Sequence, residues 1–313
     1  MNLPVSIDGL EQAALPPRPL HLAIGMFDGV HLGHRAVIDA AVQSAHGSGG
    51  LAGVLTFWPH PSTLFRPQEP TRLIQDSATK ARMLTGLGVD VVIAQPFTRE
   101  LAAVAAEEFL PWLKQRLPRL AAVYVGENFR FGQGRRGDVA LLIASGRQLG
   151  VRVFNAARVR LDGDSISSTR IRRLLAAGEV EAANALLGYA YVASGVVTPG
   201  KRLGRTIGFP TLNLEWAPEL KPRFGVYAVR VSGAKSAAPL PAVANYGLRP
   251  TVEQTTVPRL EVHVLGDCPF GEGDAVTTEW LRFLRPEMKF ANVEALRAQI
   301  AQDRAAAAAY FGR

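Results

Sequence analysis

The run Gly25–His34 carries two histidines, His31 and His34, separated by two residues that include a glycine. It follows the apolar segment Leu20–Ile24, typical of a buried strand, and precedes Arg35–Ala45, whose apolar spacing predicts a helix. At such a junction the unpaired backbone N–H groups and the helix dipole favour an anion. Two imidazoles can add donors, which indicates chemistry on a nucleotide α-phosphate. Histidines at a helix start can also simply cap the helix.

Strand and helix patterns alternate over the first half of the chain, which predicts a doubly wound parallel sheet with helices on both faces. Ligands of such sheets bind at the carboxyl ends of the strands, where the Gly25–His34 turn and the loop that begins at Gly126 both lie. The expected strands are Leu20–Ile24, Leu51–Phe57, Val89–Ala94, Ala121–Val125 and Val151–Ala156, and the expected helices are Arg35–Ala45, Ser77–Leu87, Ala106–Leu117 and Asp138–Leu149.

After Gly188 the pattern changes to Val-, Tyr- and Thr-rich segments with turns between them, and no helix separates them before Val293–Tyr310. This order predicts a small antiparallel β-barrel with a closing helix. Ser168–Leu187 is expected to close the first domain, as one helix or as a pair broken near Gly178. The expected domains are 1–187 and 188–313. The expected barrel strands are Tyr191–Thr198, Gly225–Val231, Ala242–Tyr246, Arg259–Leu265 and Ala275–Leu284.

Three further constellations in the first domain admit two interpretations each. Phe57–Pro61 could form an apolar shelf for a flat ring, or could be an ordinary hydrophobic strand end. Asn128 and the basic residues after it can reach polar groups of a nucleotide. Ser168, Thr169 and Arg170 at a helix start could bind a second anion, although Ser and Thr are also the usual N-caps.

The second domain opens with a loop over residues 194–214 that is rich in Gly and Arg and able to wrap a polyphosphate. It is not a Walker A loop. Thr211 and Asn213 lie two residues apart, so in an extended segment they share a face and could bind the Mg²⁺ of MgATP, or could form a polar turn. Glu261 alternates with apolar residues on an expected strand, where it could act as a base or simply face solvent.

The motif GxFDGxHxGH resembles the HxGH nucleotidyltransferases, specifically the FMN adenylyltransferase module of bacterial FAD synthetases, over about 180 residues of a Rossmann-like domain. The resemblance implies that His31 and His34 are catalytic and hold the ATP phosphates. Asn128 stands where many relatives carry Asp, and Met26 where Asn is common. The implied ATP-binding residues are Gly25, Phe27, Asp28, His31, His34, Asn128, Ser168, Thr169 and Arg170, and the implied flavin-binding residues are Phe57, Pro59, His60, Phe129 and Phe131.

The loop with its PTxN sequence, and the segments that follow, resemble riboflavin kinases. Glu261 aligns with the catalytic base of that family, and Thr211 and Asn213 are expected to bind Mg²⁺ with ATP. The segments Pro269–Gly271 and Leu186–Tyr191 depart from the family pattern. The implied ATP-binding residues are Gly200, Lys201, Gly204, Arg205, Thr211 and Asn213, and the implied flavin-binding residues are Arg285 and Glu287.

Together the resemblances imply a bifunctional enzyme that phosphorylates riboflavin to FMN, with ADP as by-product, and then adenylylates FMN to FAD with release of pyrophosphate. ATP and Mg²⁺ are expected for both steps. A chain with one live activity, a flavin carrier and a nucleic-acid-binding module are the alternatives. Conversion of riboflavin and MgATP into FAD, into FMN alone or into neither would distinguish the bifunctional enzyme, the single activity and the binding proteins.

Composition favours an ordinary globular enzyme over the nucleic-acid-binding alternative. The net charge is +8, but residues 1–186 hold 20 basic and 16 acidic residues and residues 187–313 hold 15 and 11, so no basic arm stands out. Cys268 is the single cysteine, which fits a reducing cytoplasm. We expect no nucleic-acid partner, no membrane span, and a monomer or weak oligomer.

Overall fold

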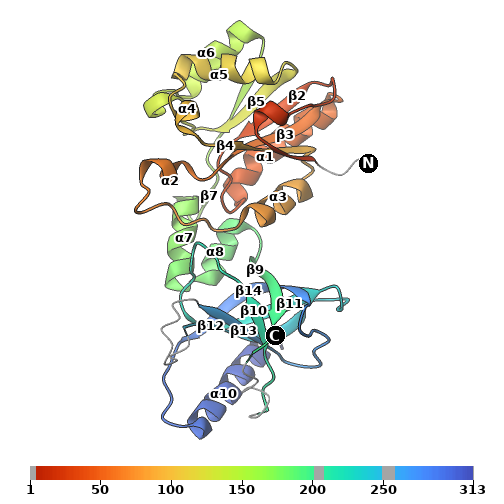
Figure 1. Ribbon diagram of the computed structural model, residues 1–313, viewed down its shortest axis with the longest axis vertical. Helices are drawn as coiled ribbons and strands as arrows, with labels where there is room; N and C mark the ends of the chain where they lie inside the picture. Colours follow the sequence, from red (N-terminus) through yellow and green to blue (C-terminus); the bar gives the residue numbers. More distant parts are fainter. Residues whose placement is uncertain (1–4, 201–207, 249–257, 313) are drawn as a thin grey trace. The chain divides into compact units, whose positions relative to one another are not determined.

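The computed structural model describes residues 5–200, 208–248 and 258–312 (Figure 1). By internal packing the chain forms two compact units, Met1–Ser168 and Thr169–Arg313. Each unit is built around its own sheet.

The first unit contains a six-stranded sheet in the order β1-β4-β3-β2-β5-β6, with every adjacent pair parallel. This confirms the predicted parallel sheet. β1 was not predicted, because four residues are too short for a clear alternating pattern. The strands are β1 (Val5–Asp8), β2 (Leu20–Ile24), β3 (Leu51–Trp58), β4 (Val91–Pro96), β5 (Leu120–Gly126) and β6 (Arg152–Ala156).

Helices cover both faces of this sheet, as Figure 1 shows. One face packs against α1 (Leu32–Gly47) and α3 (Ser77–Gly86), through buried residues such as Ile38 and Leu84. The other face packs against α5 (Ala106–Arg116) and α6 (Val139–Leu149), through residues such as Leu110 and Leu142. All five residues of β2 are buried, so the strand that leads into the His31 turn is held from both sides.

Short elements that the sequence pattern did not predict fill the connections of the first unit. They lie in loops, where a single helical turn or a two-residue strand leaves no periodic signal. They are η1 (Leu10–Gln12), α2 (Pro61–Phe65), α4 (Arg99–Ala102), η2 (Gln133–Arg135), β7 (Arg160–Leu161) and β8 (Asp164–Ser165).

The segment Ser168–Leu187 forms a helical pair, α7 (Ser168–Ala177) and α8 (Val180–Leu187). The break falls at Gly178, whose φ of 83° favours glycine. Asn184 of α8 donates to the Trp280 carbonyl at 2.8 Å and accepts from the Tyr191 amide at 2.7 Å. These contacts group α8 with the second unit, whereas the sequence pattern assigned both helices to the end of the first domain. The domain boundary at residues 187 and 188 stays a prediction.

The second unit is a closed antiparallel barrel in the order β10-β13-β12-β11-β14-β9. This confirms the predicted barrel, but with six strands in place of five. The additional strand, β10, contains only four residues and overlaps the end of segment 194–214, which the sequence pattern predicted as a loop. The strands are β9 (Tyr191–Thr198), β10 (Leu212–Glu215), β11 (Gly225–Gly233), β12 (Leu240–Gly247), β13 (Arg259–Val264) and β14 (Ala275–Pro286).

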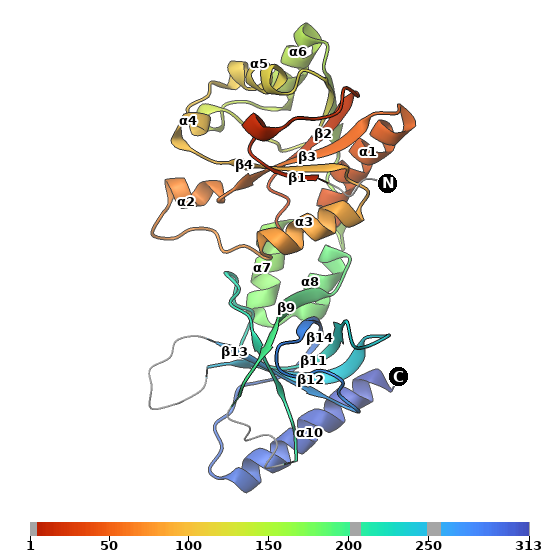
Figure 2. The ribbon, with the colours of Figure 1, turned by 45° about the vertical axis from the view of Figure 1, so that its right-hand side comes forward.

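Aromatic side chains fill the interior of the barrel. Tyr227, Tyr246 and Trp280 are all less than 2% exposed, and the Tyr227 and Trp280 rings lie 4.5 Å apart. The closing helix α10 (Val293–Phe311) packs outside the barrel (Figure 2). Ala307 of this helix shares a buried cluster with Val226 and Val243 of the strands. Because the interior is filled, any ligand of this barrel must bind on its outer surface or at its ends.

Candidate active sites

The first candidate site is the turn between β2 and α1. His31 is the N-cap of α1, and its Nδ1 accepts a hydrogen bond from the His34 amide at 3.2 Å. The two imidazoles are stacked, with ring centroids 3.5 Å apart and planes 16° apart. A side chain at Gly33 would contact the His31 ring at 3.2 Å, so glycine leaves room for it. His31 therefore caps the helix, as one sequence interpretation predicted, and the two histidines lie side by side at its N-terminus, while their part in phosphate chemistry stays a prediction.

The turn before His31 has an unusual backbone. Phe27, Gly29 and Val30 have φ values of 47°, 84° and 34°. For a β-branched residue such as Val30 this conformation is costly, and such strain concentrates at functional sites. A side chain at Gly25 would approach the Phe27 ring to 3.0 Å. These residues hold the backbone close to the helix N-terminus.

Asp28 is buried inside this turn. Its carboxylate accepts from the Ile74 amide at 3.0 Å, and its own carbonyl accepts from Ser168 Oγ at 2.8 Å. Ser168 therefore lies beside the turn, and its predicted part in phosphate binding stays a prediction. Thr169 and Arg170 follow Ser168 in α7 and begin the second unit, so their part in phosphate binding stays a prediction.

Lys80 of α3 is a residue that sequence reasoning missed. It is 7% exposed, and its ammonium donates to the Met26 carbonyl at 3.3 Å and to Thr56 Oγ1 at 3.1 Å. Burial lowers the pKa of Lys80, and the nearby Asp28 charge opposes that shift. A lysine in an amphipathic helix ordinarily faces solvent, so no sequence pattern indicated this contact.

The residues expected to face the flavin lie at the ends of β3 and β5. Phe57 meets Phe97 edge to face at 6.0 Å, and Trp58 is 42% exposed. Pro59 is exposed, and His60 caps α2 by accepting from the Ser62 amide at 3.1 Å. The carboxyl end of β3 therefore carries exposed apolar surface next to the capped N-terminus of α2.

The loop after β5 carries the other predicted residues. The Phe129 ring stacks on Phe131 at 5.5 Å, and Phe131 packs against Phe109 in the core at 5.0 Å. Phe131 is 6% exposed, so only Phe129 is accessible to a ligand. Asn128 is exposed.

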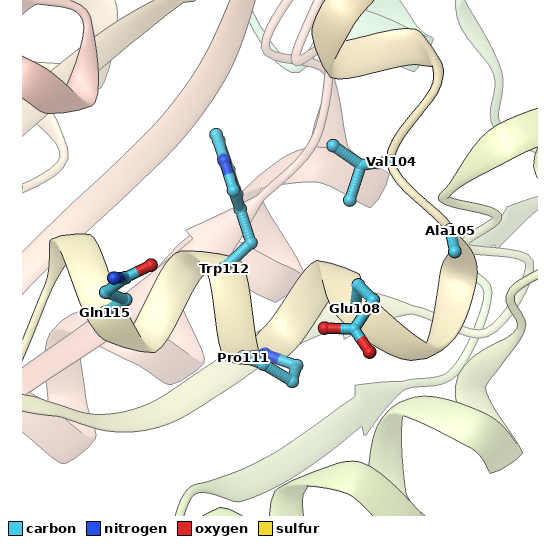
Figure 3. A pocket seen from close by; sticks show the side chains of 6 residues that line it. All are labelled: Val104, Ala105, Glu108, Pro111, Trp112 and Gln115. Carbon is cyan, nitrogen blue, oxygen red and sulfur yellow. The ribbon is translucent and has the colours of Figure 1, made fainter.

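A separate hollow lies over α5 (Figure 3). It is lined by Val104, Ala105, Glu108, Pro111, Trp112 and Gln115. None of the predicted site residues lines it.

The second candidate site is a row of residues across the barrel. Asn213 of β10 pairs with Thr198 of β9 on one side and with Glu261 of β13 on the other, and Glu261 pairs with Asn245 of β12. Their neighbours Leu212, Leu214, Leu260 and Val262 are buried in the core. Because side chains alternate across a strand, the polar row faces out of the barrel.

Asn213 has the features expected of a metal ligand. Its Oδ1 is buried and has no hydrogen-bond partner in the part of the chain that the structure describes. An amide oxygen in this state is suited to a hard cation such as Mg²⁺. The Gly200 backbone lies so close that a Cβ there would come within 2.2 Å of Asn213 Nδ2. Thr211 precedes β10, and the predicted Lys201, Gly204 and Arg205 lie outside the described residues.

No cluster of three or more His, Cys, Asp or Glu suited to a metal is found among the described residues. A Mg²⁺ site built from hydroxyl, amide and phosphate oxygens does not require such a cluster. Thr211 and Asn213 fit that donor set.

His263 of β13 also went unnoticed in the sequence. It is 8% exposed, and its Nδ1 lies 2.8 Å from the Pro210 carbonyl. It lies on the same face of β13 as Glu261.

The predicted flavin-binding residues Arg285 and Glu287 lie at the end of β14. Arg285 forms two 2.7 Å hydrogen bonds to Asp303 of α10, and its third donor reaches the Pro286 carbonyl at 2.8 Å. The Glu287 carboxylate lies against the Gly247 backbone, where no Cβ would fit. Burial raises the pKa of Glu287, and the Leu248 N–H and the Arg285 charge oppose that shift. Arg285 therefore ties the closing helix to the barrel.

Two family models match the chain. Residues 15–170 match FAD synthetase and residues 187–311 match riboflavin kinase. The chain is 38% identical to the bifunctional riboflavin kinase/FMN adenylyltransferase of Escherichia coli K12 over 312 residues, covering 100% of this chain and 98% of that protein. It is 36% identical to the protein of the same name from Listeria monocytogenes, covering 93% and 92%.

A solved structure is similar along nearly the whole chain. The crystal structure described as a macrolide-efflux protein from Streptococcus pneumoniae matches with a TM-score of 0.85 and 27% identity, covering 96% of this chain and 97% of that one. In this protein, no helix within the described residues is long and apolar enough to cross a membrane.

Proposed function

The chain belongs to the bifunctional riboflavin kinase/FMN adenylyltransferase family and makes FMN and FAD, and we propose that each reaction uses its own residues. The turn at His31 and His34 serves adenylyl transfer. The cross-strand row of Thr198, Asn213, Glu261 and Asn245 serves the kinase reaction. The observation that carries this assignment is the direct pairing of Asn213 with Glu261, which sets a suited metal ligand beside a suited base.

In adenylyl transfer, a phosphate oxygen of FMN attacks the α-phosphorus of ATP. The bond to the β-phosphate oxygen breaks, and pyrophosphate leaves. His31 and His34 supply N–H donors to the phosphates at the N-terminus of α1, where the helix dipole favours the developing negative charge. Ser168, Thr169 and Arg170 extend the phosphate contacts, with Gly25, Phe27, Asp28 and Asn128 shaping the ATP site. Asp28 acts through the backbone, since its carboxylate accepts from the Ile74 amide.

In the kinase reaction, the primary hydroxyl of the riboflavin ribityl chain attacks the γ-phosphorus of ATP, and ADP leaves. Glu261 accepts the hydroxyl proton. Thr211 and Asn213 would hold Mg²⁺ on the ATP phosphates, where the ion would neutralise their charge. Gly200, Lys201, Gly204 and Arg205 complete the ATP site.

The isoalloxazine ring binds at two places in this proposal. In the first unit it lies against Phe57, Pro59 and His60 and against Phe129, with Phe131 supporting Phe129 from the core. In the second unit Glu287 contacts the flavin, and Arg285 fixes the strand end from which Glu287 follows.

We further propose a cytoplasmic enzyme that acts as a monomer or weak oligomer, with riboflavin, FMN, FAD, ATP, ADP and pyrophosphate as its ligands. Nucleic acid and membrane have no role in this proposal. The free cysteine Cys268 supports a reducing compartment.

The two activities can be separated by mutation. The double variant His31→Ala/His34→Ala should convert riboflavin to FMN and stop there. Thr211→Ala and Asn213→Asp should fail to phosphorylate riboflavin but still convert supplied FMN to FAD. Chromatographic separation of the flavins measures both, and Glu215→Gln, on the same strand and exposed, is the control. A histidine double variant that makes FAD at the parent rate contradicts the assignment of the turn.

A further inference from the structure

His263 contributes to no step proposed above, yet it lies next to the kinase residues. It follows Glu261 by two residues on β13, so the two side chains share the outer face of the barrel. Unlike Glu261, it is almost fully covered, with 8% of its surface exposed. A buried polar ring on an outer face needs a partner there.

The partner is the segment that leads into the proposed metal ligands. His263 Nδ1 lies 2.8 Å from the Pro210 carbonyl oxygen. A carbonyl oxygen can only accept, so Nδ1 carries the proton and donates. The imidazole also meets the Phe209 ring edge to face, with centroids 5.7 Å apart. His263 therefore holds both residues that immediately precede Thr211.

The strand register relates the contact between His263 and Pro210 to the proposed metal ligands. Leu212 pairs with Val262, and Asn213 pairs with Glu261. The paired register ends at Leu212, and extending it by one residue would set Thr211 opposite His263. Two successive outer positions of β13 thus correspond to the two proposed metal ligands.

The second ring nitrogen of His263, Nε2, faces no donor in the described residues. Nε2 is buried and has no hydrogen-bond partner within residues 5–200, 208–248 and 258–312. With the proton on Nδ1, this nitrogen holds a lone pair without a donor. Leaving such a group buried without a donor costs stability, so its position calls for an explanation beyond packing alone.

We propose that His263 is a positioning residue of the kinase reaction. Its hydrogen bond to the Pro210 carbonyl fixes Phe209 and Pro210, so that Thr211 and Asn213 present their oxygens together to the Mg²⁺ of MgATP. The proposal rests on the metal role given above to Thr211 and Asn213. It requires no change in the charge of His263.

The test compares three substitutions that differ in where they place a donor. His263→Asn keeps an N–H near the position of Nδ1, His263→Gln moves it toward the position of Nε2, and His263→Leu removes it. Val264→Ala is the control, because Val264 is buried on the same strand but faces the core. Two quantities are measured, the Mg²⁺ concentration that gives half-maximal riboflavin phosphorylation and the gain in ADP affinity when Mg²⁺ is added.

His263→Leu and His263→Gln should raise the Mg²⁺ requirement about tenfold and reduce the Mg²⁺-dependent gain in ADP affinity by a similar factor, as expected for one lost hydrogen bond. His263→Asn should stay within about threefold of the parent. Val264→Ala should change neither quantity. FMN adenylylation should be unchanged in all four variants.

Two results would overturn the proposal. One is a Leu variant within about twofold of the parent in both quantities, and the other is an Asn variant as impaired as the Leu variant. Thr211→Ala and Asn213→Asp are measured in parallel. If they lose the Mg²⁺ response while His263→Leu and His263→Gln keep it, only the role of His263 fails. If Thr211→Ala and Asn213→Asp also keep the Mg²⁺ response, the metal assignment of Thr211 and Asn213 fails together with the role of His263.

Discussion

Asn213 and Glu261 are direct cross-strand partners on β10 and β13, and both side chains face out of the barrel. Residues so paired have Cβ atoms about 4.5–5.5 Å apart. The proposed metal ligand and the proposed base are thus close enough to act on the phosphate and on the attacking hydroxyl of one reaction. The partners lie far apart in the chain, so the fold alone creates this proximity.

Substitution of the base should slow the chemical step. Glu261→Gln keeps the shape of the side chain but removes the proton acceptor, so we expect the kinase kcat to fall by about 10²–10⁴-fold. Riboflavin affinity should change much less, because the interaction strengthens in the transition state. Steady-state kinetics measures both. Glu279→Gln on β14 is the control, and a Glu261→Gln kcat within about threefold of the parent would return Glu261 to an ordinary surface role.

Adding one methyl group at Gly200 should disturb the proposed metal ligand. The new Cβ would come within 2.2 Å of Asn213 Nδ2, so the amide must move. Because that amide is the end of a flexible side chain, the unfolding temperature should change little while the KM for MgATP rises about tenfold. Gly266→Ala adds the same group in open space and serves as control. An unchanged KM would show that the position of the Asn213 amide is unimportant.

The candidate sites were predictable from the sequence in different degrees. Alternation along β13 indicated which face Glu261 occupies, because a two-residue period is a local property. The pairing with Asn213 was not predictable, since β10 has four residues and register depends on contacts between distant segments. Lys80 and His263 were missed for a related reason. Their role is set by which backbone carbonyl lies beside them, and no local pattern encodes that.

Removal of the buried ammonium in the first unit should lower both stability and adenylylation. Lys80→Met removes a positive charge that acts on the buried Asp28 carboxylate and a donor to two oxygens, so the free energy of unfolding should fall. The Met26 carbonyl and Thr56 lose a shared donor at the His31 turn, and FMN adenylylation should fall about tenfold with kinase activity unchanged. Lys114→Met is a matched control, because Lys114 also donates to two backbone carbonyls, those of Pro118 and Leu120. Equal rates of FMN adenylylation in Lys80→Met and Lys114→Met would show that Lys80 does not position the His31 turn.

His21 should make the first unit sensitive to mild acid. Its ring lies 3.1 Å from the Tyr124 hydroxyl and 3.1 Å from Ser48 Oγ, and burial, with the Arg152 charge, lowers the pKa of His21 below the usual 6.5. The unfolded chain therefore binds the proton more tightly, so the free energy of unfolding is highest above pH 6.5 and decreases as the pH falls below it.

Urea unfolding at about pH 7.5 and about pH 5.5 measures this effect. The His21→Gln variant should show a smaller loss between the two conditions than the parent. Equal losses in both proteins would assign the acid sensitivity to other groups.

The barrel divides its two tasks between alternate residues of the same strands. On β13, Leu260, Val262 and Val264 fill the interior, while Glu261 and His263 lie on the outer face, where we propose the kinase site. Selection on protein abundance and selection on flavin synthesis therefore act on interleaved positions that hardly overlap. In a saturation mutagenesis screen along this strand, substitutions at the inward-facing positions should reduce expression. Substitutions at the outward-facing positions should reduce turnover instead. The barrel could thus change its catalytic residues during evolution without rebuilding its core.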